Sequence, residues 1–121
     1  MGPLFVGTLF MIAMSLAGHV AAQDVVKVSP ETHAVLLENE HVRVLDVHAK
    51  PGETVLMHSH PASTLYYVAD GKMKITYPDG RTEERTVKAG AAVWSMAVTH
   101  AVENIDANEL HEVHIELKAI K

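Results

Sequence analysis

The sequence has no cysteine, and aromatic residues make up only 5% of its 121 positions. The missing cysteines exclude disulfide bonds and the C-x-x-C motif of thiol redox proteins. The sequence also contains neither a nucleophile-elbow motif nor a phosphate-binding glycine loop. A chain of this length forms one domain with a modest core, so a homodimer is a reasonable expectation.

Positive charge is scarce as well. Ten Lys and Arg residues face fifteen Asp and Glu residues, which gives a formal net charge of −5. The basic residues are scattered, and no basic patch is available to neutralise phosphates or to bind an anionic membrane surface. These features argue against a nucleic-acid partner and against binding to an anionic membrane surface.

Long amphipathic helical segments are lacking, and short β-branched runs take their place from residue 25 onward. Turn dipeptides separate these runs every 8 to 12 residues or so, which predicts an all-β sandwich or barrel. Asp70-Gly71 is typical of a type I′ hairpin with positive φ at both residues, and Pro78-Asp79-Gly80 predicts the next reversal. The charged residues 81–87 predict an exposed edge strand, whereas residues 29–40 fit a short helix or a strand equally well.

Residues 1–22 differ from the rest because they form an apolar run without strand alternation or a polar helix face. The run is short for a membrane span and ends in Val20-Ala21-Ala22, which predicts a signal peptide cleaved after Ala22. The mature protein would then be periplasmic or secreted and would have no membrane segment. An uncleaved anchor and a misassigned start codon are the alternatives.

Two histidines, His58 and His60, stand one residue apart at the end of an apolar run. In a strand their side chains point to the same face, which they share with Thr54 and Leu56, and we assign this face to the interior. A metal ion requires at least a third ligand, and His100 is the best candidate. Two histidines on a solvated strand face are the competing interpretation.

The surroundings of these histidines resemble the cupin superfamily. Its first motif is Gly, five residues, His, any residue, His, three or four residues, Glu, six residues, Gly. The sequence "GETVLMHSHPASTLYYVADG", from Gly52 to Gly71, matches this motif except that Thr64 replaces the Glu. The second motif is Gly, five residues, Pro, any residue, Gly, two residues, His, three residues, Asn. Its counterpart here supplies Gly90, His100 and Asn104, but it lacks the Pro and the inner Gly and is one residue short.

The resemblance covers about residues 42–118 and implies a jelly-roll β-barrel, with residues 23–41 as an N-terminal segment packing on a cupin domain of residues 42–121. It also implies a divalent metal (Fe, Mn, Ni, Co, Cu or Zn) held by His58, His60 and His100. With Thr64 at the carboxylate position, three interpretations stay open: an open three-histidine site, a site completed by His111, or a pocket without metal. His111 enters because its apolar parity partners on the last run predict an inward face.

The implied activity is that of a metal-dependent cupin acting on a small anionic or chelating substrate. The expected chemistry is dioxygenase-type, or else that of a lyase or isomerase. The alternative is a metal-free or non-catalytic cupin that binds a sugar or another small molecule.

The remaining candidates are weaker. Tyr66 has the parity of Thr64 and is expected to point into the pocket, as a donor to the metal ligands or as a core aromatic. Asn104 either orients a ligand or closes a turn, and His114 is expected on the solvent face. Met73, Trp94 and Met96 would line the cavity or pack in the core. His33 and His41 are expected at the surface, and His48 has a less favourable position for metal binding.

Overall fold

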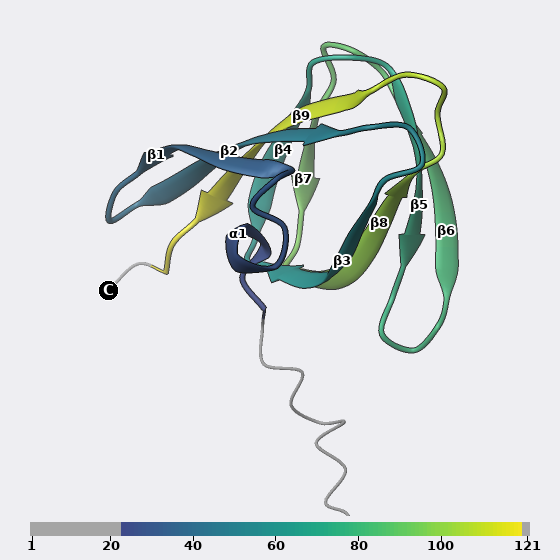
Figure 1. Ribbon diagram of the computed structural model, residues 1–121. Coiled ribbons are helices and arrows are strands. Elements are labelled where there is room, and N and C mark those ends of the chain that lie inside the picture. The colour runs from purple at the N-terminus through teal and green to yellow at the C-terminus, as the bar shows by residue number, and fades with distance from the viewer. Residues whose placement is uncertain (1–22, 120–121) are drawn as a thin grey trace, which may run out of the picture.

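The computed structural model of the protein describes residues 23–119, and the predicted signal peptide lies outside them (Figure 1). Within these residues, no helix is long and apolar enough to cross a membrane. The elements are α1 (Val25–Val28), β1 (His33–Glu38), β2 (Val42–Ala49), β3 (Thr54–His60), β4 (Ser63–Tyr67), β5 (Gly71–Thr76), β6 (Thr82–Val87), β7 (Ala92–Ser95), β8 (Val98–Asn104) and β9 (Leu110–Leu117).

The strands form two antiparallel sheets that lie against each other (Figure 1). One sheet has the order β1-β2-β9-β4-β7, and the other has the order β3-β8-β5-β6. Strands that follow each other in the chain often belong to opposite sheets, as β4 and β5 do. This arrangement confirms the prediction of an all-β jelly-roll fold.

The space between the sheets holds two apolar clusters. One includes Leu65, Met73 and Ile75, and the other includes Val25 and Leu45. Full burial of one such aliphatic side chain contributes about 1.5–3 kcal/mol. Met73 belongs to the first cluster and is only 4% exposed, so it is a core residue. A group of histidines lines the same internal space together with Glu112.

A β-bulge in β3 determines which of its residues face the interior. The pairing with β8 shifts between Val55 and His58. Val55 pairs with Val102 and His58 with His100, so β3 advances three residues while β8 advances two. Val55, His58 and His60 are all buried as a result, whereas Leu56 is 66% exposed. The predicted inward face for the histidines is confirmed, but placing Thr54 and Leu56 on that face was wrong, because a bulge reverses the alternation.

The two glycine turns have different outcomes. Gly80 has φ of 88° in the tight turn between β5 and β6, as the sequence predicts. The type I′ hairpin predicted at Asp70-Gly71 is wrong, because β4 and β5 lie in different sheets and the only positive-φ residues within 23–119 are Gly52, Gly80 and Gly90. Gly71 serves close packing instead, since a Cβ there would lie 2.9 Å from Leu110 Cδ1.

The N-terminal residues 23–38 form one helical turn and one strand. Asp24 caps α1 by accepting a hydrogen bond from the Val26 amide. Residues 33–38 pair with β2, so the ambiguous segment 29–40 forms mainly a strand. β6 lies at the edge of its sheet and is mostly exposed, as its charged sequence predicts.

Strand β9 presents its polar residues to the interior. Glu112, His114 and Glu116 are 7%, 4% and 2% exposed, whereas Leu117 on the other face is 42% exposed. The predictions that His114 faces solvent and that the apolar residues beside His111 face inward were both wrong. Hydropathy misassigns this strand because it contributes to a polar cavity rather than to the apolar core.

Candidate metal centre

The three histidines chosen from the sequence come together from two neighbouring strands. His58 and His60 lie on β3, and His100 lies on β8 as the cross-strand partner of His58. The ring centroids are 4.7 Å apart for His58 and His60, 4.8 Å for His58 and His100, and 5.7 Å for His60 and His100. One nitrogen from each ring lies within 4.8 Å of the other two, which makes the three a candidate metal site.

Hydrogen bonds on the far side of two rings orient them for this role. The Nδ1 of His58 lies 2.6 Å from the Leu56 carbonyl oxygen, which can only accept, so Nδ1 carries the proton. The Nδ1 of His60 lies 2.6 Å from Glu116 Oε2 in the same way. Each Nε2 therefore has a free lone pair, and His60 Nε2 is buried without a hydrogen-bond partner among residues 23–119. Metal-ligating histidines are commonly held by a carboxylate or carbonyl in this manner.

The carboxylate of Glu116 is itself held in place. Arg43 donates to Glu116 Oε1 at 2.7 Å and forms two hydrogen bonds of 2.9 Å with Asp24, the N-cap of α1. Burial acts to raise the pKa of Glu116, but the hydrogen bonds from His60 and Arg43 outweigh it and lower the pKa. Glu116 is therefore an anion that accepts a hydrogen bond from His60 Nδ1. Residues of β2, β9 and α1 together hold the His60 ring in place.

Burial also keeps the three imidazoles neutral. Desolvation lowers the pKa of His58 to about 4 and that of His100 to about 3, with a smaller contribution from the neighbouring histidines. The pKa of His60 is lowered for the same first reason, although its bond to Glu116 acts against the shift. Neutral imidazole is the form that binds a metal ion. The site is thus ready for a divalent cation at neutral pH.

Two further buried histidines surround this centre. His33 on β1 is 3% exposed, and its ring centroid lies 5.9 Å from that of His58. His114 on β9 lies 4.6 Å from His60 by the same measure. Its Nε2 is 3.0 Å from Glu112 Oε1 without the alignment of a hydrogen bond. Sequence reasoning missed these residues and placed His33 at the surface, which was wrong. The signal for β9 is the recurrence of ionisable residues at every second position of a strand.

Thr64 and Tyr66 do not take the places predicted for them. On β4 the buried residues are Ser63, Leu65 and Tyr67, so the two intervening side chains point to the outer face. Tyr66 is 45% exposed, and its predicted inward direction was wrong. Thr64 is in register with Trp94 on β7 and Ile115 on β9. Ser63 and Leu65 flank it on the inner face, and β4 contains no Asp or Glu, so this strand supplies no carboxylate to the centre.

His111 also lies outside the centre. It is on the outer face of β9, where Nε2 lies 2.8 Å from Asp46 Oδ1. It therefore does not complete the three-histidine group, because neighbouring residues on β9 point to opposite faces. Asn104 closes a turn: its Nδ2 donates to the carbonyl oxygens of Ala49 and Asn108, and its Oδ1 accepts from the Asp106 amide.

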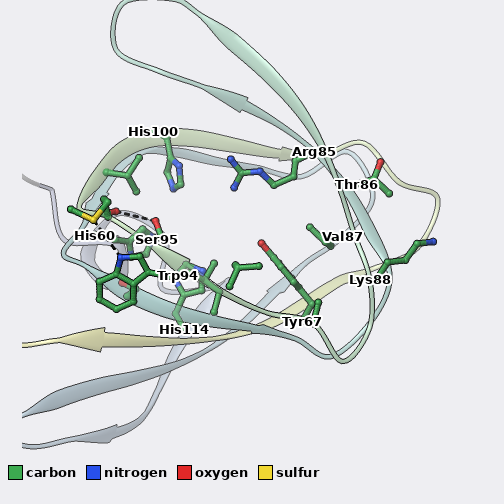
Figure 2. Close-up of a pocket in the computed structure, with 16 residues that line it drawn as sticks. His60, Tyr67, Arg85, Thr86, Val87, Lys88, Trp94, Ser95, His100 and His114 are labelled. Atoms are coloured by element: carbon green, nitrogen blue, oxygen red, sulfur yellow. Dashed lines mark hydrogen bonds between the residues drawn. The ribbon is translucent and has the colours of Figure 1, made fainter.

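A cavity of about 570 Å³ opens beside His60 and His100 (Figure 2). Arg85 extends from β6 towards His100, and the Tyr67 hydroxyl points into the same space from the other side (Figure 2). Trp94 and Met96 also line it and are 55% and 71% exposed, so they are cavity residues rather than core residues. His60 and His100 thus form one wall of a pocket that is large enough for a small organic molecule.

Comparisons with known proteins agree with this geometry. The sequence pattern of the cupin domain matches residues 45–116. A cupin domain from Bordetella pertussis Tohama I is 26% identical over 72% of this chain and 92% of that chain, with a TM-score of 0.67. An RmlC-like cupin with a double-stranded β-helix fold from Methanocaldococcus jannaschii is 22% identical over 71% and 78% of the two chains, with a TM-score of 0.58.

A third similar structure is the oxalate decarboxylase of Bacillus subtilis, an enzyme with Mn(II) centres. It is 24% identical with a TM-score of 0.51, and the match covers 68% of this chain but only 23% of that one. No curated protein matches the sequence. Because the family's pattern covers more than half of the chain and the fold agrees with it, the protein belongs to the cupin family.

Proposed function

We propose that the protein binds one divalent transition metal through His58, His60 and His100 and acts on a small organic anion. The observation that carries this proposal is the pairing of His60 with Glu116. A buried Nε2 without a partner costs about 1–3 kcal/mol of desolvation, which a bound cation would offset. The carboxylate on Nδ1 leaves that Nε2 as a lone-pair donor.

The donor set suits several ions. Three neutral imidazoles fit Fe, Mn, Ni, Co, Cu or Zn. The B. subtilis oxalate decarboxylase has Mn(II) centres, which places Mn among the ions to test first. A metal in this position supplies a Lewis acid that polarises substrate oxygens, and it keeps its full positive charge because the three histidines are neutral.

The cavity wall supports an anionic substrate. Arg85 extends towards His100 and has Glu83 as its own partner at 2.6 Å, and Lys88 also lines the cavity (Figure 2). A guanidinium with several donors can bind Glu83 and a substrate carboxylate at once. Tyr67 is 2% exposed, and its hydroxyl provides a further polar group for orientation. These residues bind and orient the substrate, while the apolar wall of Leu65 and Val93 excludes water.

The reaction class we propose is dioxygenase-type, with a lyase or isomerase as the related alternative. A three-histidine site without a carboxylate ligand from β4 leaves coordination positions free for substrate and oxygen. We also propose that the chain is exported, on the strength of residues 1–22, and that it forms a homodimer. Amino-terminal sequencing of the exported protein and its mass in solution test the last two proposals.

The metal proposal is tested by elemental analysis of protein purified without a histidine tag and dialysed against metal-free buffer. We expect one ion per wild-type chain to survive the dialysis in the internal centre, His58→Ala to lose it, and Thr64→Ala to retain it, because Thr64 faces away from the site. Equal losses in both variants would mean that Thr64 or its surroundings contribute to the site. No metal in the wild type and unchanged stability after chelation would favour a metal-free binding protein instead.

The anion proposal is tested by titrating the metal-loaded protein with oxalate. Arg85→Gln should weaken binding at least tenfold, because it removes a charge-assisted hydrogen bond. Arg81→Gln is the matched control, since Arg81 lies over the Tyr77 ring at the β5–β6 turn. Equal affinities in the two variants would contradict a role for Arg85.

A further inference from the structure

A second group of histidine and carboxylate side chains lies on the outer face of the five-stranded sheet. His48 on β2 and His111 on β9 are cross-strand partners, and Asp46 lies two residues before His48 on the same face. The two imidazole rings stack with centroids 3.9 Å apart and planes inclined by 22°. We propose that Asp46, His48 and His111 form a second metal site, one suited to Zn²⁺ and independent of the proposed internal centre.

The ligand atoms converge closely enough for one ion. The Nε2 of His111 lies 2.8 Å from Asp46 Oδ1, and the Nε2 of His48 lies 3.1 Å from Asp46 Oδ2. Zinc binds nitrogen and carboxylate oxygen at about 2.0–2.2 Å, so tetrahedral ligands are separated by roughly 3.3 Å. The observed spacings are within about 0.5 Å of that value. A small rotation of partly exposed side chains would therefore admit the ion.

The site is reachable from solvent. The side chains of His48, Asp46 and His111 are 45%, 27% and 29% exposed. Solvent access allows a metal to exchange and leaves room for water as a fourth ligand. The residues in register with Asp46 are Ala34 on β1 and Val113 on β9, neither of which carries charge.

A carboxylate orients one of the proposed ligands. Glu109, in the loop before β9, contacts His48 Nδ1 through its Oε1. In the metal-free protein Nε2 of the same ring is hydrogen-bonded to Asp46. A cation bound here would replace the proton on Nε2, while Glu109 would keep holding Nδ1. A carboxylate on Nδ1 also orients His60 in the internal centre. Two carboxylates beside two imidazoles also give this surface the negative charge that attracts a cation.

The strand alternation separates this group from the internal centre. Val47 lies between Asp46 and His48 in sequence and is 2% exposed, facing the interior. Glu112 follows His111 and points inward in the same way. The outer group thus lies on the outer face of the five-stranded sheet, whereas the ligands of the internal centre come from β3 and β8 of the other sheet. The two groups share no side chain, so either should bind without the other.

The test is a Zn²⁺ titration of the full mature chain, followed by calorimetry and by elemental analysis. We expect two Zn²⁺ per wild-type chain and one in the double variant His48→Gln/His111→Gln, with Asp46→Asn weakening the second site at least tenfold. His41→Gln is the matched control, since His41 is an exposed histidine at the β1–β2 turn, and it should keep two. Conversely, His58→Ala should lose the internal ion and keep the outer one.

A readout without mutation guards against misfolded variants. Addition of Zn²⁺ to the wild type should shift the imidazole NMR signals of both His48 and His111, with saturation at one ion for this pair. Unchanged imidazole signals, or identical Zn²⁺ stoichiometry and affinity in the wild type and the double variant, would overturn the proposal and leave these residues as a hydrogen-bonded surface cluster.

Discussion

The single residue that most shapes the internal centre is Glu116. One of its oxygens accepts a hydrogen bond from His60 Nδ1, and the other accepts a hydrogen bond from Arg43. Removal of one member of such a buried network leaves a charge or a donor without its partner, and the cost is several kcal/mol. The free Nε2 of His60 on β3 therefore depends on Glu116 of β9 and Arg43 of β2.

Glu116→Gln should weaken metal binding about 10- to 100-fold, because an amide can also donate and no longer forces the proton onto Nδ1. The dissociation constant can be measured by competition with a chromophoric chelator. Glu84→Gln, at an exposed position of the edge strand β6, is the control and should leave the constant unchanged. An unaltered affinity in Glu116→Gln would show that the ring orientation does not depend on this carboxylate.

At the scale of an element, the bulge in β3 is decisive. It turns His58 inward after Val55. The carbonyl oxygen of Leu56, which lies within the bulge, accepts a hydrogen bond from His58 Nδ1. Bulges beside functional sites commonly re-aim a side chain in this way. The bulge thus sets both the direction and the protonation of one ligand.

Two single-residue deletions separate these effects. Deletion of Met57 should restore regular alternation and keep both histidines inward, so that metal is retained with weaker affinity. Deletion of Ser59 should place the two histidines on opposite faces and abolish metal binding at the internal centre. Elemental analysis of the two variants, with circular dichroism as a check of the fold, decides the matter. Retention of metal after loss of Ser59 would mean that the register of β3 is not what aligns the site.

At the scale of the whole molecule, the barrel buries an unusual amount of ionisable surface between two apolar clusters. Three of the buried imidazoles have pKa values lowered chiefly by desolvation, to about 2 for His33, about 4 for His58 and about 3 for His100. The unfolded chain binds protons at these histidines with the ordinary pKa of 6.5. Below that pH the unfolded state therefore binds more protons than the folded state.

The contribution of these three histidines to the free energy of unfolding of the metal-free protein should consequently be constant well above pH 6.5 and decrease as the pH falls from 6.5 towards 4. Each histidine adds a slope of up to about 1.4 kcal/mol per pH unit. Urea unfolding of chelator-treated protein at pH 7.5, 6 and 5 measures this dependence. His58→Gln should show a shallower slope, by about one proton. A profile that stays flat down to pH 5 would contradict neutral burial of these rings.

Some of these features are determined by the sequence alone. Short β-branched runs and turn residues predict the all-β fold, because strand alternation and glycine or proline turns are local properties. The spacing of His58 and His60 predicts that they share a face, since residues two apart on a strand point the same way. The resemblance to the two cupin motifs adds His100 as the third ligand. The edge position of β6 also follows from its charges.

Only the tertiary structure decides which face of each strand is inside. A one-residue bulge reverses β3 before His58, and on β9 the ionisable face points inward because the barrel encloses a polar cavity. Partners distant in sequence then complete both histidine groups, Glu116 for His60 and Asp46 for His111. Hydropathy carries no information about such pairings, because they depend on the order of strands in the sheets and not on any local pattern.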